Sequence, residues 1–126
     1  MEIETSNFNV GIDCEEISRW RSMLSKLEVG FQRKLFTEAE HKYCRSFKDP
    51  APHYAVRWCA KEALVKALSP FCQLDLRSIE VTNDKKGRPS FVLYDLDVAC
   101  LNLTIRVSLT HSKETAMAIV IVVVCE

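Results

Sequence analysis

The spacing of apolar residues predicts helix and strand in the first part of the chain. Ile17, Trp20, Leu24 and Leu27 recur three or four positions apart, which indicates an amphipathic helix over residues 15–28. Residues 8–13, just before it, are expected to form a strand.

The longest predicted helix lies in the middle of the sequence. Ala60, Leu64 and Leu68 keep the helical period, and the segment from His53 onward is rich in Ala, Leu, Lys and Glu, which favour helices. Pro70 is expected to end this helix.

Cap and turn chemistry predicts two further features. Thr37 and Glu40 have the spacing of a capping box, so a helix should begin there and run to about Arg45. Residues 84–89 contain the Asp, Gly and Pro that are typical of a hairpin connection.

The second half of the chain changes to strand patterns. Residues 78–83 and 90–94 flank the predicted turn, and residues 104–110 alternate between apolar and polar. Residues 96–101 are expected to form a short helix. Residues 116–124 are rich in Ile and Val, which is typical of a strand buried on both faces.

These elements indicate one α+β domain over residues 1–126, with a small antiparallel sheet packed against a long central helix and shorter helices. The 126 residues are 48% hydrophobic, enough for a single core. No repeat or linker divides the sequence.

Charge and cysteine content narrow the function classes. Basic and acidic residues balance at 17 each, so net charge suggests neither a nucleic-acid nor a membrane partner. The six cysteines form no C-x-x-C pair, and the N-terminus resembles no secretory signal. We therefore expect a cytoplasmic protein whose thiols are mostly small core residues. The longest apolar run, residues 116–125, is shorter than the roughly 20 residues that span a bilayer.

Asp13 is the first candidate for chemistry. It ends the predicted first strand and follows the small residue Gly11, which would let another group approach. Such a carboxylate suits a hard cation, but Asp is also a favoured helix N-cap. The residues alone favour the cap.

The long helix carries four charged candidates: Arg57, Lys61, Glu62 and Lys66. At about 100° per residue, Glu62 and Lys66 share one face, and Arg57 and Lys61 share another. An exposed ion pair four residues apart is the favoured explanation of Glu62 and Lys66. The alternative is a Mg²⁺ carboxylate with a lysine directed at the same phosphate.

Two other polar groups leave alternatives open. His111 lies among Ser and Thr hydroxyls and beside Lys113, so it could belong to a phosphate-binding turn or to an ordinary polar turn. Arg19, Arg21 and Lys26 form a locally basic helix face. Such a face is usually only solvated, but it would also suit an acidic protein partner.

Taken together, five segments resemble the holo-acyl-carrier-protein synthases. They are residues 10–13 (VGID), 36–40 (FTEAE), 57–67 (RWCAKEALVKA), 83–89 (NDKKGRP) and 107–112 (VSLTHS). Each string alone is weak, but their order and the chain length make the resemblance specific over nearly the whole sequence. It replaces the structural interpretations of Asp13, Glu62, Lys66 and His111 with functional ones.

The resemblance implies a 4′-phosphopantetheinyl transferase-like fold and a Mg²⁺-dependent transferase. Such an enzyme moves the 4′-phosphopantetheine group of coenzyme A to a serine of an apo-acyl carrier protein, as in fatty acid biosynthesis, and releases 3′,5′-ADP. Family members of this size imply a homotrimer with sites between subunits.

The resemblance also implies residue roles. Asp13 and Glu62 would bind Mg²⁺, and Glu62 and Lys66 would act on the transferring phosphate. Coenzyme A would be held by four side chains: Arg57, Lys61, Lys66 and His111. The acidic carrier would dock on Arg19, Arg21 and Lys26.

One departure from the family pattern keeps a second function open. Family members have a Gly-rich stretch after the signature helix, whereas residues 68–72 read LSPFC. The chain could therefore be a carrier-binding or coenzyme-binding module without turnover, although both carboxylates are retained. A purely structural domain would require five coincidental matches.

Overall fold

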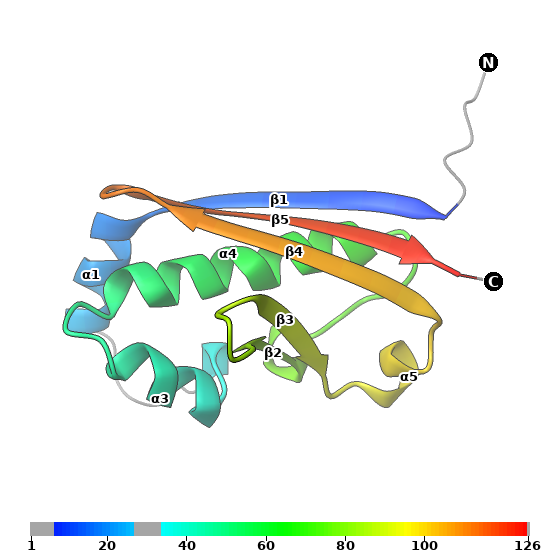
Figure 1. Ribbon diagram of the computed structural model, residues 1–126, viewed down its shortest axis with the longest axis horizontal. Helices are drawn as coiled ribbons and strands as arrows, with labels where there is room; N and C mark the ends of the chain where they lie inside the picture. Colours follow the sequence, from blue (N-terminus) through cyan, green and yellow to red (C-terminus); the bar gives the residue numbers. More distant parts are fainter. Residues whose placement is uncertain (1–6, 27–33, 126) are drawn as a thin grey trace, which may run out of the picture.

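The computed structural model describes residues 7–26 and 34–125. Its elements are β1 (Phe8–Glu16), α1 (Ile17–Lys26), α3 (Glu38–Arg45), α4 (Ala51–Leu68), the 3₁₀ turn η1 (Leu76–Ser78), β2 (Ile79–Asn83), β3 (Pro89–Leu93), α5 (Leu96–Ala99), β4 (Leu103–His111) and β5 (Thr115–Val124). Figure 1 shows the main sheet lying over α4, with the hairpin β2–β3 and α3 on the other side of that helix. The predicted α+β architecture is confirmed.

The main sheet joins the two ends of the described chain. Its strand order is β1-β5-β4, and all neighbours are antiparallel. β1 pairs with β5 as far as Glu16 opposite Thr115, so the strand extends beyond its predicted end at Asp13. Because α1 begins only at Ile17, Asp13 lies inside a strand and does not cap a helix. The predicted end of the first helix, near Glu28, lies outside the described residues.

Gly11 allows β1 and α4 to approach closely. A Cβ atom at this position would lie 1.9 Å from the carbonyl oxygen of Ala63, so a larger residue would force the backbones apart. Two positions earlier on the same face of β1, Asn9 donates a hydrogen bond of 2.9 Å to the carbonyl of Ala67. The inner face of β1 is thus held directly on α4.

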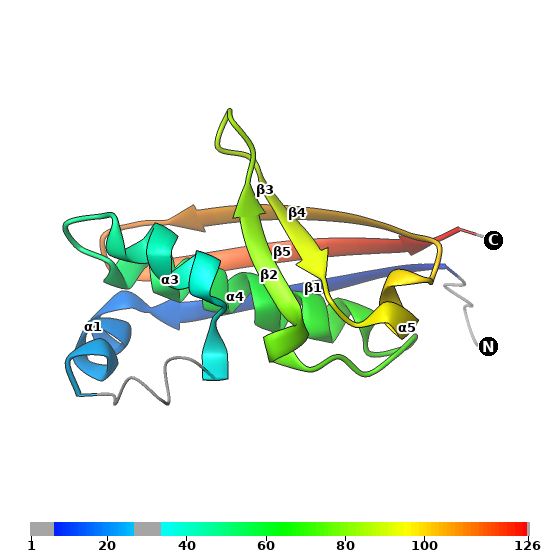
Figure 2. The ribbon, with the colours of Figure 1, turned by 90° about the horizontal axis from the view of Figure 1, so that it is seen from below.

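The hairpin and α3 cover the side of α4 that faces away from the sheet. Seen from below in Figure 2, β2 and β3 cross α4 at a steep angle, and their turn projects beyond β4. That turn has the predicted chemistry: Gly87 has a φ of +83°, and Asp84 Oδ1 accepts from the N–H groups of Lys86 and Arg88. The capping box of Thr37 and Glu40 is also present.

The last strand differs from its prediction. Ala118, Val120 and Val122 are buried against α4, but the alternate residues of β5 remain partly exposed. α4 covers only one face of the sheet, so the expectation of burial on both faces is wrong for the single chain. The uncovered side is called the outer apolar face, and it consists of Phe8, Val10, Ile12, Met117, Ile119 and Ile121.

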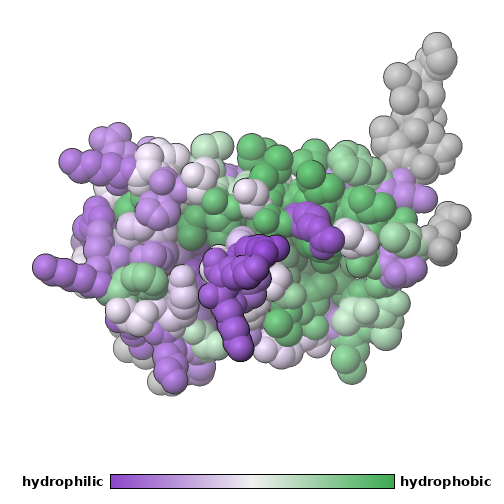
Figure 3. All heavy atoms as spheres, viewed as in Figure 1, coloured by the Kyte–Doolittle hydropathy of each residue, from purple (hydrophilic) through white to green (hydrophobic). Residues whose placement is uncertain are grey.

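The surface is divided by polarity. Figure 3 shows apolar surface along the sheet and towards α5, whereas polar surface covers the end that carries α1 and α3. No helix in the described part of the chain has both the length and the apolar character needed to cross a bilayer.

The cysteines are less buried than predicted. All six are free thiols, and only Cys44 and Cys59 lie in the core. Burial raises the pKa of Cys44 to about 12, so this thiol stays protonated. Three others, Cys14, Cys100 and Cys125, are exposed, which corrects the prediction that most are core residues.

Candidate functional site

Three of the predicted residues converge where β1 packs along α4. The Lys66 ammonium lies 3.3 Å from Asp13 Oδ1 and donates a 3.0 Å hydrogen bond to the carbonyl of Ile12. Glu62 precedes Lys66 by one helical turn on the same face of α4. We call Asp13, Glu62 and Lys66 the acid–lysine site.

The two carboxylates of this site influence each other. Burial raises the pKa of Glu62, the negative charge of Asp13 raises it further, and Lys66 opposes the shift. Glu62 makes no ion pair within the described ranges, because the Lys66 ammonium is directed at Asp13 instead. The favoured interpretation of an exposed Glu62–Lys66 pair therefore does not describe the structure.

One carboxylate oxygen of the acid–lysine site is not paired with a donor or a cation in the described part of the chain. Asp13 Oδ2 is buried and has no hydrogen-bond partner in the described part of the chain. A carboxylate oxygen in this state is stabilised by a cation. Mg²⁺ fits, because it commonly binds one or two carboxylates and keeps several waters. No group of three or more His, Cys, Asp or Glu side chains suited to a metal occurs among residues 7–26 and 34–125, so the protein's own ligands would be these two carboxylates.

Arg57 lies on the opposite side of α4. It is nine residues from Lys66, which corresponds to a rotation of about 180° around the helix. Its Nη2 donates to Asn83 Oδ1, and its Cζ lies 3.8 Å from the centre of the Tyr43 ring. Tyr43, Arg57, Asn83 and the hairpin turn line a pocket of 390 Å³, here called the Arg57 pocket.

His111 lies near the same side of α4 as Arg57, beside His53. It ends β4, at the other edge of the sheet from Asp13, and its ring centre lies 6.2 Å from that of His53. The hydroxyl of Ser112 accepts hydrogen bonds from the N–H groups of Glu114 and Thr115, and so it stabilises the turn. The imidazole of His111 is exposed, and its Nδ1 lies 3.3 Å from the carbonyl oxygen of Ser112.

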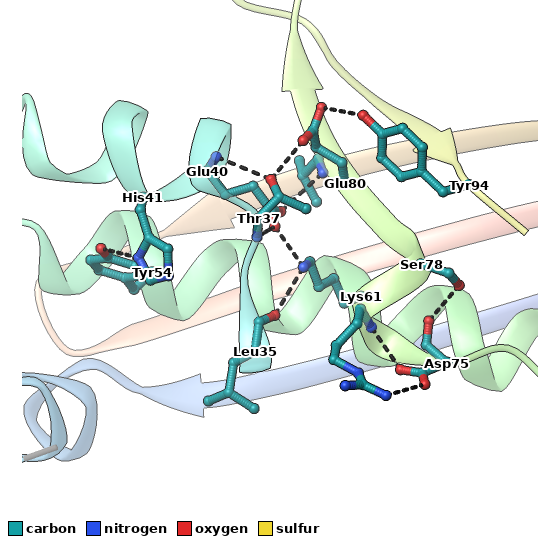
Figure 4. Close-up of polar contacts among 12 residues, drawn as sticks. Leu35, Thr37, Glu40, His41, Tyr54, Lys61, Asp75, Ser78, Glu80 and Tyr94 are labelled. Atoms are coloured by element: carbon teal, nitrogen blue, oxygen red, sulfur yellow. Dashed lines mark hydrogen bonds and ion pairs between the residues drawn. The ribbon is translucent and has the colours of Figure 1, made fainter. Parts of the chain in front are cut away.

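Lys61 lies apart from both groups. Its fully buried ammonium is 2.6 Å from Glu40 Oε1 and donates to the carbonyl of Leu35 at 2.9 Å. Glu40 Oε2 also accepts from the N–H of Val81, so the pair ties α3, α4 and β2 together (Figure 4). Burial lowers the pKa of Lys61, and Glu40 counters that shift. The structure therefore gives Lys61 a packing role instead of the predicted contact with coenzyme A.

The basic residues of α1 are exposed, as docking would require. Arg19 and Lys26 are seven residues apart and share one face of the helix. Arg21 points elsewhere and forms a 2.6 Å ion pair with Asp49. Its charge is therefore partly matched within the chain.

The segment after α4 turns without glycine. The N–H groups of Phe71 and Cys72 both bond to the carbonyl of Leu68, and the hydroxyl of Ser69 bonds to the carbonyl of Lys66. These bonds satisfy the last carbonyls of the helix without a left-handed residue. The turn borders a pocket of 690 Å³ that begins at Val65, one turn beyond Glu62.

The site contains contacts that no sequence pattern indicates. Tyr43 has no sequence signal for its contact with Arg57, because the two residues lie on different helices. Asn83 opens the hairpin motif, but its hydrogen bond to Arg57 depends on how the hairpin packs.

Known proteins resemble this chain in both sequence and structure. A family profile described as "4'-phosphopantetheinyl transferase superfamily" matches residues 9–120. A holo-[acyl-carrier-protein] synthase of Syntrophus aciditrophicus is 40% identical over 117 residues, which cover 88% of this chain and 91% of that protein. The corresponding synthase of Herpetosiphon aurantiacus is 40% identical over 123 residues, covering 88% and 94%.

Solved structures agree with these matches. A Bacillus anthracis holo-(acyl-carrier-protein) synthase "in complex with CoA (3',5'-ADP)" superposes with a TM-score of 0.78 at 28% identity, covering 95% of this chain and 100% of that one. The Mycobacterium tuberculosis acyl carrier protein synthase gives 0.71 at 36% identity, covering 93% and 97%.

Proposed function

Because this chain belongs to the 4′-phosphopantetheinyl transferase superfamily, we propose that it transfers the 4′-phosphopantetheine group of coenzyme A to a serine of an apo-acyl carrier protein. The observation that carries this proposal is the convergence of Asp13, Glu62 and Lys66 where β1 packs along α4. The segment after α4, which left a module without turnover open, closes its hydrogen bonds without glycine.

The reaction replaces the phosphoanhydride bond of coenzyme A with a phosphate ester to serine. The serine oxygen attacks the β-phosphorus, the bond from that phosphorus to 3′,5′-ADP breaks, and the serine proton leaves. The Lys66 ammonium would neutralise the transferring phosphate, and Asp13 and Glu62 would hold Mg²⁺, which supplies further charge neutralisation. Glu62 would accept the serine proton, because it is a carboxylate of this site with no ion pair in the described part of the chain.

The proposed enzyme is a homotrimer with sites between subunits. The acid–lysine site and the Arg57 pocket lie on opposite sides of α4 in one chain. If the acid–lysine site of one copy faces the Arg57 pocket and His111 of another, one coenzyme A can contact both. The oligomer thus explains why the predicted residues fall into two groups.

The outer apolar face supplies a surface for such assembly. Val10 opposes Ile121 and Ile12 opposes Ile119 in the sheet register, so their side chains form a continuous patch. Between 37% and 54% of each of these residues remains exposed in the single chain. Contiguous exposed apolar patches commonly mark protein–protein contacts.

The transfer itself provides the test. Apo-acyl carrier protein is incubated with coenzyme A, Mg²⁺ and this protein, and the carrier is weighed by mass spectrometry. We expect a gain of one phosphopantetheinyl group with the wild-type protein and loss of transfer in Asp13→Asn and Glu62→Gln. Asp97→Asn, at an exposed aspartate of α5, is the matched control and should retain activity.

Two outcomes would contradict the proposal. The function is wrong if a folded wild-type protein leaves the carrier unmodified at saturating coenzyme A and Mg²⁺. The ligand assignment is wrong if either carboxylate variant keeps the wild-type rate at limiting Mg²⁺.

A further inference from the structure

Arg57 is a buried cation that has no carboxylate partner among the residues that the structure describes. Only 3% of the residue is exposed, and its Nε has no hydrogen-bond partner in the described part of the chain. Among residues 7–26 and 34–125 no ion pair links it to Asp or Glu. A buried charge in this state is costly unless a ligand of opposite charge completes the site.

The two described groups that contact the Arg57 guanidinium are neutral. Its Nη2 donates to the amide oxygen of Asn83, and its Cζ lies 3.8 Å from the centre of the Tyr43 ring. An aromatic face attracts a guanidinium electrostatically and packs against its plane, but leaves its full positive charge. A carboxylate at the same place would orient Arg57 equally well and would cancel the charge that an anion needs.

Other aromatic side chains hold Tyr43 in place. Its ring centre lies 5.1 Å from that of Phe47 and 6.1 Å from that of His53, both edge to face. Phe47 and His53 stack on each other at 3.6 Å. Since His53 is also next to His111, one aromatic cluster connects both residues assigned to the nucleotide end.

The Arg57 pocket suits an anion on its open side as well. Lys85 adds a second cation to the lining. The one carboxylate in the lining, Asp84, already accepts from two N–H groups of the hairpin turn. Its charge is therefore partly satisfied within the turn.

We propose that Tyr43 is a positioning residue that holds Arg57 ready for a phosphate group at the nucleotide end of the donor. This inference rests on the proposed function for the identity of the donor. It assigns the recognition of the 3′-phosphate to the pair Tyr43–Arg57. The aromatic face of Tyr43, and not its hydroxyl, positions the guanidinium.

Equilibrium binding of two nucleotides tests this inference without turnover. 3′,5′-ADP and 5′-AMP share the adenosine and the 5′-phosphate, and only the first has a 3′-phosphate. Calorimetry on the wild-type protein is expected to show tighter binding of 3′,5′-ADP. In Tyr43→Leu that preference should fall about tenfold, the size of a desolvated cation–π contact, while the affinity for 5′-AMP stays within twofold.

Three variants separate positioning from a general loss of structure. Tyr43→Phe keeps the ring and should keep the preference, and Tyr43→Gln lacks the ring and should behave like Tyr43→Leu. Tyr94→Leu, the same change at an exposed tyrosine of the β3–α5 connection, should change neither affinity. Thermal unfolding confirms that each variant is folded.

The inference is overturned if Tyr43→Leu weakens both nucleotides equally, if Tyr43→Phe loses the preference, or if the wild-type protein does not prefer 3′,5′-ADP. The proposed function fails separately. A shifted preference with no transfer to any carrier would leave the role of Tyr43 intact and reject the transferase. If transfer to the carrier occurs but Tyr43→Leu keeps the wild-type preference for 3′,5′-ADP, the transferase stands and the role of Tyr43 is rejected.

Discussion

Glu62 is held in an environment that disfavours its own charge. Burial and the neighbouring carboxylate of Asp13 raise its pKa above the ordinary value of 4.5. A group whose pKa is raised in the folded state is destabilised once it ionises, so its contribution to stability is lost as the pH rises through the folded pKa. Such a conflict is typical of residues retained for function.

Replacing Glu62 should therefore stabilise the protein while removing its activity. Without Mg²⁺, Glu62→Gln is expected to unfold at a higher temperature than the wild type at pH 7, and the difference should vanish below about pH 4, where Glu62 is protonated in both states. Differential scanning calorimetry in a chelating buffer measures both. Added Mg²⁺ should raise the melting temperature of the wild type only.

The control for this prediction is Glu114→Gln, at an exposed glutamate of the β4–β5 turn. It should change the melting temperature little at either pH. A Glu62→Gln variant that is less stable than the wild type at pH 7 would show that the carboxylate is stabilising and that the charge conflict is absent.

At the scale of elements, the acid–lysine site depends on the distance between β1 and α4. The backbone contact at Gly11 sets that distance, and Asp13 lies two residues further along the same face of β1. The strand and the helix therefore act as one unit in placing Asp13 beside Lys66.

Gly11→Ala should disturb stability and activity together. Its new Cβ would meet the backbone of Ala63, which has no side-chain freedom to move away. We expect a loss of about 1–3 kcal/mol, as in other overpacked cores, and a reduced transfer rate in the folded fraction. Chemical denaturation and the mass assay measure the two effects. Cys14→Ala, at an exposed position of the same strand, should be close to wild type; equal behaviour of both variants would reject the contact.

The helix α1 is the element to which we assign carrier docking. Arg19→Glu should raise KM for the acidic carrier severalfold at low salt and leave the affinity for coenzyme A unchanged. Steady-state kinetics with each substrate varied in turn measure both values. Arg77→Glu, at an exposed arginine of η1, is the matched control for the change in charge. Equal losses for the carrier and coenzyme A would reject docking on α1.

At the scale of the whole molecule, the proposal requires residues of two copies at each site. Arg57 and Glu62 are on opposite sides of α4, so a variant at either position damages a different half of the interface. Subunits that each lack one half can then complement each other.

Mixing two inactive variants should restore transfer. Arg57→Ala and Glu62→Gln, each inactive alone, are unfolded together, refolded and assayed; some sites in the mixed trimers then receive an intact half from each copy. Light scattering should give the trimer mass. Adding Ile119→Lys to both variants places a charge on the outer apolar face, and this should abolish assembly and the restored activity. A monomer mass for the wild type, or no recovery in confirmed mixed trimers, would reject shared sites.

Short-range sequence patterns correctly predicted the elements whose ends are set by residues close to them in the sequence. The capping box of α3, the glycine turn of the hairpin and the long helix α4 all occur as predicted. The separation of Arg57 from Glu62 also follows from the helical period alone. Elements whose ends depend on distant partners were less accurate: β1 extends past Asp13 because β5, from the other end of the chain, pairs with it.

The amino-acid order alone was thus sufficient for the α+β class, the family resemblance and the side chains that could hold a metal and a phosphate, because these depend on residue type and short spacing. Packing decided which of those side chains meet. It directed Lys66 to Asp13, buried Lys61 against Glu40 and placed Tyr43 on Arg57. Each of these contacts joins different elements, and no local pattern specifies how separate elements come together around a common core.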